Sequence, residues 1–502
     1  MVAPEMAPMT PRRSRVQRPS REAVALIGIA VAVVVVMLAF LGADPAFGVT
    51  TSNGPFTDES WDVMNARNLV LLGTWATDDW MLHLVNLPFS VSVAAVFTVL
   101  GVGIEQARLV SIAATGVTVA ALGLGLRRWV GAGPAALAAI AYGGATLVLY
   151  YGRLAFLEPM VAMWLTLGAL TVLRAGSHRA GRVGLLGGLL LALAVGTKPS
   201  ALAAVAGIVL AVAIVGWRQP PVRRWAGGAA LSIAVLGAGW IGLIWLPNRS
   251  GISDVLRIWA SEPIIAPLRT VLRRIDTFPD SDGFVALSAP LLAAGTAGWA
   301  MAITRWRALT PELRLLLAAA TGWLVFGLGL LAVAPYRPNR YDLPLLPALA
   351  ILVGIGARLA SSAIARPATG RGRRTTWAAA TALALVLVVP GLLSYGSWMR
   401  SATYRLPALQ ALIAGVIPAG SATQGDYAPA FAMRARALTI VSRPATGISP
   451  GDLYASRGVR WFVGRPGQAP AWASLHQAAW DARQSVVCSP WGSEQVCLWR
   501  LP

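Results

Sequence analysis

Two adjacent acids, Asp58 and Glu59, stand in the stretch Phe56-Thr57-Asp58-Glu59-Ser60-Trp61-Asp62, the first long polar segment after an apolar run. A carboxylate that is partly desolvated at the edge of a membrane gains proton affinity and can accept a proton from a hydroxyl group. One acid could act as a general base while the other holds a metal or orients the attacking group. Alternatively, both acids only cap the start of a helix, where negative charge is favoured.

A third acid, Glu158, lies in the otherwise uncharged run Leu154–Leu173. An ionisable side chain within an apolar span is costly, so it is a functional candidate, with Arg153 and Lys198 as its candidate partners. The alternative is a purely structural ion pair. Lys198 is the only lysine of the chain and precedes Pro199, where the chain must turn. It would meet an anionic lipid headgroup, or simply extend its ammonium group to the interface.

Arg337, Arg340 and Tyr341 lie between two apolar spans. Together with Arg153 and Lys198 they could form a basic pocket for a phosphate group. The alternative is contact with lipid headgroups. In either case the basic side chains and the acids would gather at one edge of the membrane.

Asp79 and His83 have the i, i+4 spacing that could place two ligands of a divalent metal on one face of a helix. Two ligands alone are a weak signal, so a divalent metal stays an open alternative and no other cofactor is expected. The sequence contains no Walker loop and no G-x-G-x-x-G motif after a strand.

The elements that position these residues must be membrane helices. The 502-residue chain is 56% hydrophobic and 13% charged, and its mean hydropathy is +0.63. A soluble domain carries far more polar surface. The net charge of +21 does not indicate a nucleic-acid partner, because the sequence has no basic low-complexity tract beyond the short cluster Arg12-Arg13-Ser14-Arg15.

The fold class predicted is an all-α polytopic membrane protein with about eleven transmembrane helices. A run of about 20 apolar residues suits the ~30 Å hydrocarbon core of a bilayer. The first run, Ala23–Ala43, could be a signal peptide, but it is long for one and has no A-x-A site, so we interpret it as an uncleaved span. The predicted spans are 23–43, 107–126, 132–151, 154–173, 183–197, 199–217, 225–246, 284–304, 315–335, 342–357 and 375–396.

Charge distribution predicts the orientation of these spans. With the N-terminus in the cytoplasm, 21 of the 42 basic residues and three of the 21 acids lie inside, so the net charge is about +18 inside and +3 outside. The uncharged segment 84–104 would reverse this map if it spanned. We expect an interfacial or re-entrant helix there instead, opened by Pro88 and closed by Gly101 and Gly103. The predicted location is the inner, or plasma, membrane.

The predicted parts are a basic cytoplasmic N-terminus, a membrane domain with two long outer loops, and a small extracytoplasmic α/β domain. Their bounds are 1–22, 23–396 with loops 44–105 and 247–283, and 397–502. Cys488 and Cys497, the only cysteines, flank a predicted hairpin turn in the last part. Outside the cytoplasm a disulfide is the expected state, and two free thiols are the alternative.

A series of short pieces resembles the GT-C membrane glycosyltransferases that use polyprenyl-phosphate sugars, which include protein O-mannosyltransferases and lipid A aminoarabinose transferases. The resemblance covers residues 56–350. It departs from the family at Glu158, where aspartate is usual, at Pro199, where glycine is usual, and at Asn86-Leu87-Pro88-Phe89, where the family has His-Pro-Pro. The pieces are Asp58-Glu59, Asn65-Ala66-Arg67, Gly73-Thr74-Trp75, Ala107-Arg108-Leu109, Arg153 through Glu158-Pro159, Gly196-Thr197-Lys198-Pro199, and Arg340-Tyr341 with Leu343-Pro344 and Pro347.

The resemblance implies an integral-membrane enzyme that moves a hexosyl or pentosyl group from a polyprenyl-phosphate donor to a hydroxyl acceptor on a glycan, lipid or protein. It implies that Asp58 is the base and that Lys198 is the lysine of a Thr-Lys-Gly motif. A phosphate leaving group needs cations rather than a general acid, which fits the residues named above. The alternative is a transporter or flippase of lipid-linked sugars. A flippase would place its polar groups through the middle of the bundle, whereas these groups are expected at one end.

Overall fold

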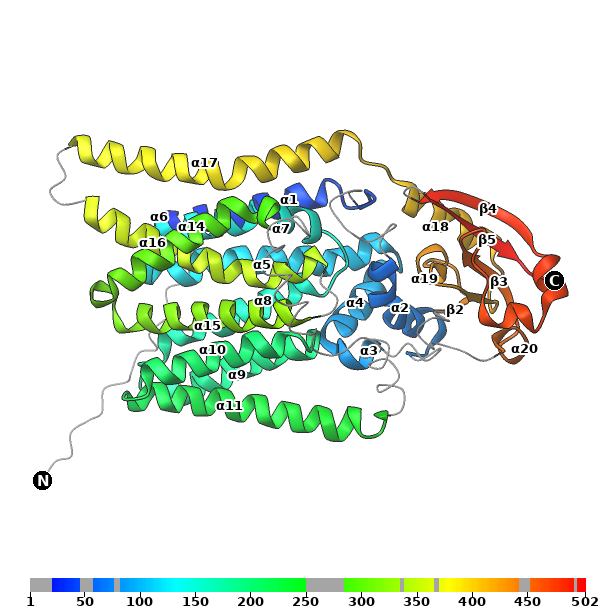
Figure 1. Ribbon diagram of the computed structural model, residues 1–502, viewed down its shortest axis with the longest axis horizontal. Coiled ribbons are helices and arrows are strands. Elements are labelled where there is room, and N and C mark those ends of the chain that lie inside the picture. The colour runs from blue at the N-terminus through cyan, green and yellow to red at the C-terminus, as the bar shows by residue number, and fades with distance from the viewer. Residues whose placement is uncertain are drawn as a thin grey trace, which may run out of the picture.

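The computed structural model describes residues 20–45, 57–75, 82–249, 284–334, 338–364, 370–441, 452–491 and 494–502. Figure 1 shows a bundle of long, roughly parallel and antiparallel helices with a small mixed α/β part at one end. A layer of shorter helices, α2, α3 and α4, lies between the two. The predicted fold class, a helical membrane bundle with a small C-terminal α/β domain, is confirmed.

The bundle contains a helix at each of the eleven predicted spans. Among the described residues, seven helical segments are long and apolar enough to cross a membrane, and α10 is one of the shorter apolar helices. The predicted span 132–151 is broken after Gly143 into α6 and α7. The helices are α1 Arg21–Leu38, α5 Ile104–Val130, α6 Ala132–Gly143, α7 Thr146–Tyr151, α8 Glu158–Leu170 with η1 Thr171–Arg174, α9 Ala180–Thr197, α10 Ala201–Gly216, α11 Pro220–Trp240 with the π-turn η2 Ile241–Trp245, α14 Phe284–Thr304, α15 Pro311–Val333, α16 Leu346–Ile364 and α17 Gly370–Arg400. Two short 3₁₀ segments, η3 Trp306–Ala308 and η4 Asn339–Leu345, connect them.

Small residues let α9 and α11 pack closely. A Cβ atom at Gly184 or Gly188 would overlap main-chain atoms of Trp225 and Ala229 on α11. Close approach through a small-xxx-small pattern is a common way for helices to associate in a membrane. The outward faces are apolar, as a lipid-facing surface requires: Leu243 is 80% exposed.

The layer between bundle and sheet consists of α2 Thr57–Leu72, α3 Leu82–Val85 and α4 Leu87–Leu100. Helix α4 begins with Pro88 in its first turn and ends at Gly101, whose φ of +83° favours glycine. Its 14 residues extend about 21 Å at 1.5 Å per residue, which is less than the ~30 Å core of a bilayer. This length supports the prediction of an interfacial or re-entrant helix at 84–104.

The C-terminal part is a five-stranded mixed sheet in the order β2-β1-β3-β5-β4. Strands β2, β1 and β3 are parallel, whereas β5 is antiparallel to both β3 and β4. Cys488 and Cys497 are directly paired across β4 and β5 and form a disulfide with an S–S distance of 2.02 Å. The elements are α18 Arg405–Val416, β1 Ala422–Gln424, α19 Ala428–Phe431, β2 Leu438–Ile440, α20 Leu453–Ser456, β3 Val459–Gly464, η6 Ala471–Ser474, α21 Gln477–Asp481, β4 Gln484–Trp491 and β5 Glu494–Arg500.

One apolar cluster joins the sheet to the bundle. It contains Val63 of α2, Phe89 and Phe97 of α4, Phe431 of α19 and Val463 of β3, and these side chains are almost fully buried. The position of α2 is therefore determined by both the bundle and the C-terminal part.

Candidate active site

Four charged residues from four elements meet at the end of the bundle next to α2. Asp58 is in the first turn of α2 and Glu158 in the first turn of α8, where negative charge is favoured. Lys198 follows the last residue of α9 in an extended conformation, with φ −153° and ψ 118°, as expected for a residue before proline. Arg340 lies in η4. The predicted gathering of these acids and cations at one end of the bundle is thus found in the structure.

These side chains form three linked ion pairs. Lys198 Nζ lies 2.5 Å from Glu158 Oε1, and Arg340 Nε lies 3.6 Å from the same oxygen. Arg340 Nη2 also donates to Asp58 Oδ2. Glu158 is 2% exposed, whereas the side chain of Asp58 is 26% exposed. Asp58 is therefore the acid of this chain of contacts that a substrate can reach more easily.

Aromatic rings hold the two cations in place. Lys198 Nζ lies 3.3 Å from the centre of the Tyr341 ring, and the Arg340 guanidinium carbon lies 5.1 Å from the centre of the Phe156 ring. Such cation–π contacts are worth most where water is excluded. We call Asp58, Glu158, Lys198, Arg340 and Tyr341 the charged cluster.

A pocket adjoins the charged cluster. Glu158, Lys198 and Tyr341 form its polar end, and its remaining lining is mostly apolar and comes from α8, α10, α15 and the end of η4. The apolar residues include Val161, Leu165, Ala201, Ala204, Leu330 and Leu331. A pocket with charge at one end and aliphatic walls beyond it suits a ligand with an anionic head and a hydrocarbon tail.

Asp62 is a further acid on α2, one helical turn after Asp58. Residues i and i+4 lie on the same face of a helix, so Asp62 lies on the side of α2 that carries Asp58. Burial raises the pKa of Asp62 well above its ordinary value, and Asp58 and Glu158 raise it further, while Arg340 and Lys198 oppose this. The sequence analysis did not single out Asp62, although its i, i+4 spacing from Asp58 was visible.

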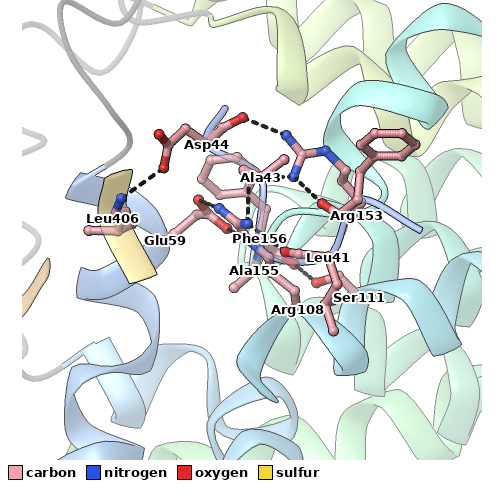
Figure 2. Close-up of polar contacts among 11 residues, drawn as sticks. Leu41, Ala43, Asp44, Glu59, Arg108, Ser111, Arg153, Ala155, Phe156 and Leu406 are labelled. Atoms are coloured by element: carbon pink, nitrogen blue, oxygen red, sulfur yellow. Dashed lines mark hydrogen bonds and ion pairs between the residues drawn. The ribbon is translucent and has the colours of Figure 1, made fainter. Parts of the chain in front are cut away.

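Glu59 points away from the charged cluster, into the protein. Its two carboxylate oxygens pair with Arg108 at 2.8 and 2.9 Å, and Oε1 also accepts from the Ala155 N–H at 2.8 Å. Figure 2 shows this bidentate pair. Arg108 Nη1 donates in turn to the carbonyl oxygens of Leu41 and Ala43, both at 2.7 Å. Glu59 thus joins α2 to α5 and to the segment after α1, rather than facing Lys198 and Arg340.

Arg153 also differs from the expectation that it would line the phosphate pocket. Its guanidinium donates to the carbonyl oxygens of Ala43 and Asp44 at 2.8 and 2.9 Å and stacks 4.3 Å from the Trp398 ring centre. The carboxylate of Asp44 accepts from the Leu406 N–H at the start of α18, as Figure 2 shows. Arg153 and Asp44 therefore fix the chain between α1 and the C-terminal part.

Arg67 attaches α2 to the C-terminal part. Its side chain is fully buried and donates to the carbonyl oxygens of Ala432, Met433, Ala435 and Ala437. Burial lowers the pKa of Arg67 to about 9. Main-chain oxygens take the place of the water that would otherwise solvate this cation. The indole N–H of Trp61 adds a bond of 2.8 Å to the Asp426 carbonyl oxygen.

Three predicted site residues cannot be placed in the same way. Arg337 and Asp79 lie outside the described residues, and of His83 the structure describes only its place in α3. Within the described ranges no group of three His, Cys, Asp or Glu side chains is arranged to hold a metal ion. The metal hypothesis for Asp79 and His83 stays a prediction.

No protein-family model matches the chain, and no curated protein sequence matches it. Its fold is that of solved GT-C glycosyltransferases. ArnT from Cupriavidus metallidurans bound to undecaprenyl phosphate superimposes with a TM-score of 0.61 and 17% identity over 95% of this chain and 97% of that one. The Archaeoglobus fulgidus oligosaccharyltransferase in complex with Zn and sulfate gives a TM-score of 0.50 and 13% identity over 88% of this chain and 68% of that one.

Proposed function

We propose that this protein is a membrane glycosyltransferase that moves a sugar from a polyprenyl-phosphate donor to a hydroxyl group of a glycan, lipid or protein. The observation that carries the proposal is the charged cluster at the head of a largely aliphatic pocket. The GT-C fold supports it, as does the undecaprenyl phosphate bound by the structurally similar ArnT.

The donor's phosphate would bind Lys198 and Arg340. Both are cations beside the polar end of the pocket, and both are already held by aromatic rings. An arginine fork and a lysine ammonium together fit a phosphate group. The isoprenoid tail would lie along the aliphatic walls formed by α8, α10 and α15. Glu158 and Tyr341 would hold Lys198 in position. Arg153 and Glu59 would hold together the segments that surround the site, through the Ala43 carbonyl oxygen and Arg108.

Asp58 would act as the base in a single displacement. The acceptor's hydroxyl oxygen forms a bond to the anomeric carbon, and its proton passes to the Asp58 carboxylate. The bond between that carbon and the phosphate oxygen breaks, and its electron pair leaves with the phosphate. Lys198 and Arg340 face the charge that grows there. Because attack and departure occur on opposite sides of the sugar carbon, the configuration inverts.

The reaction would take place on the extracytoplasmic side of the inner membrane. Helix α9 places Lys198 at one end and Arg179 and Arg182 at the other, about 27 Å away at 1.5 Å per residue over 18 residues. Basic loops face the cytoplasm, so the charged cluster faces outward. A cysteine at exposed Ser401 should react with an impermeant thiol reagent in intact cells. A cysteine at Ser177, in the loop before α9, should not, and the reverse pattern would invert the orientation.

The test of the function is to incubate membranes that contain the protein with labelled polyprenyl-phosphate sugars. We expect one label to leave the lipid and to appear in an acceptor, and Asp58→Asn to abolish most of this transfer. Movement of the intact labelled lipid across the bilayer, with no loss of its sugar, would instead establish a flippase and overturn the proposal.

A further inference from the structure

Asp62 differs from the other acids around the charged cluster in the contacts that it makes. Asp58 is paired with Arg340, Glu158 with Lys198 and Glu59 with Arg108. Asp62 has no hydrogen bond and no ion pair with any of the described residues, and its carboxylate is half-buried.

The surroundings of Asp62 place it beside the proposed chemistry. Four members of the charged cluster act on it electrostatically: Asp58, Glu158, Arg340 and Lys198. Within the described residues of this site, three carboxyl groups thus face two cations. Both cations are already paired with Asp58 and Glu158, so Asp62 is the carboxyl group left without a counter-ion.

A half-buried carboxyl group without a partner is costly to the fold, because its lost hydration is not replaced by hydrogen bonds. A bound ligand can replace those bonds. A carboxyl group accepts hydrogen bonds in either protonation state and also donates one while it holds a proton, which matches an alcohol or sugar hydroxyl group. The unpaired side chain therefore has the chemistry of a hydroxyl-binding group, one helical turn from the proposed base.

We propose that Asp62 binds the acceptor: its carboxyl group hydrogen-bonds a hydroxyl group of the incoming acceptor and holds the attacking oxygen beside Asp58. This inference rests on the proposed sugar transfer. It assigns to Asp62 the role of orienting the attacking group, which the sequence analysis expected of the partner acid in the Asp58-Glu59 pair. The ligand class is an alcohol, such as a sugar hydroxyl. Asp62 orients the nucleophile, and Asp58 takes its proton.

The inference is tested by measuring how much of the sugar goes to a membrane acceptor and how much goes to water. This measurement does not require the acceptor to be known. Membranes that contain the full-length protein are given the labelled polyprenyl-phosphate sugar that the wild type consumes. Label in a membrane acceptor reports transfer, and free labelled sugar reports transfer to water. We expect Asp62→Ala to lower the ratio of transfer to hydrolysis about tenfold or more. Transfer requires that the acceptor's hydroxyl group be oriented by Asp62, whereas attack by water does not. Asp62→Asn, which still donates and accepts, should recover a large part of the ratio.

Controls separate this inference from the function itself. Purified Asp62→Ala protein should bind undecaprenyl phosphate at least as tightly as the wild type, which shows that the site is folded. Asp481→Ala removes an exposed acid of the C-terminal part and serves as the matched control. A wild-type ratio in Asp62→Ala, or a parallel fall of transfer and hydrolysis as in Asp58→Asn, would overturn the inference. If the wild type moves no label at all, the proposed function fails instead.

Discussion

The ion pair between Asp58 and Arg340 predicts an unusual effect of Asp58→Asn on donor binding. In this structure the proposed base is paired with a proposed phosphate-binding cation. A donor phosphate must therefore compete with the Asp58 carboxylate for Arg340. Asparagine keeps the shape of the side chain but removes the competing charge. Donor affinity should rise in the same variant in which turnover falls by about 10²–10⁴-fold through loss of the base.

The expected size of the effect follows from the exposure of the pair. Two unit charges about 4 Å apart interact by about 1 kcal/mol in water and about 4 kcal/mol at an effective dielectric constant of about 20. The side chain of Arg340 is 7% exposed and that of Asp58 is 26% exposed. Solvent at the Asp58 carboxylate therefore screens the pair, and the interaction energy should lie between these two values. A gain of about 1–2 kcal/mol corresponds to roughly five- to thirtyfold tighter binding.

The assay is direct binding of undecaprenyl phosphate to purified protein in lipid nanodiscs, at low and high salt. Glu105→Gln is the matched control, because Glu105 is also paired with an arginine, Arg434, at 2.8 Å but lies outside the charged cluster. Glu105→Gln should leave the affinity unchanged. Equal or weaker binding by Asp58→Asn would refute the idea that Asp58 and the phosphate compete for Arg340.

Three further predictions concern the cluster and the C-terminal part. Lys198→Ala should weaken donor binding, and its effect on the rate should shrink at saturating donor, as steady-state kinetics over a range of donor concentrations would show. Replacing Cys488 and Cys497 together with serine should lower the stability of the C-terminal part by about 2–3 kcal/mol, measured by chemical unfolding, whereas free reaction of both thiols in unreduced wild type would contradict the disulfide. The pKa of Asp62 is raised in the folded state, so over a range of pH the folded protein holds a proton that the unfolded chain releases. The free energy of unfolding should therefore fall as pH rises from the ordinary carboxyl pKa to the raised pKa. Asp62→Asn should remove this fall, and melting temperatures that decline with pH as in wild type would contradict it.

Much of the site could be predicted because its members stand at the ends of apolar segments. Glu158, Lys198 and Arg340 are charges at the boundaries of apolar runs, and the charge bias of the loops places those boundaries on one side. Helix geometry alone could not decide between Asp58 and Glu59. Neighbouring residues on a helix point about 100° apart, so at most one of them faces the cluster, and the rotation of α2 is fixed by contacts distant in sequence. One such contact is the pair of Glu59 with Arg108.

Arg153 illustrates the same limit in another way. A basic residue five positions before an acid in a membrane segment is a natural partner for that acid or for a phosphate. Its actual partners are carbonyl oxygens of Ala43 and Asp44, more than a hundred residues earlier in the chain. Main-chain acceptors leave no mark in the sequence, because every residue has a carbonyl group. The partners of Arg67 could not be predicted for the same reason, because they too are main-chain carbonyl oxygens.

The way in which Arg67 is held has a consequence for how this protein can be taken apart or recombined. A buried guanidinium solvated by the carbonyl groups of 432–437 depends on the path of that backbone, not on its side chains. Cutting the chain after α17 would remove all four main-chain carbonyl partners of this cation, which lies on the same helix that carries Asp58. The C-terminal part is therefore not an exchangeable module. A chimaera that takes this part from another protein must bring a loop of the same backbone shape as residues 432–437.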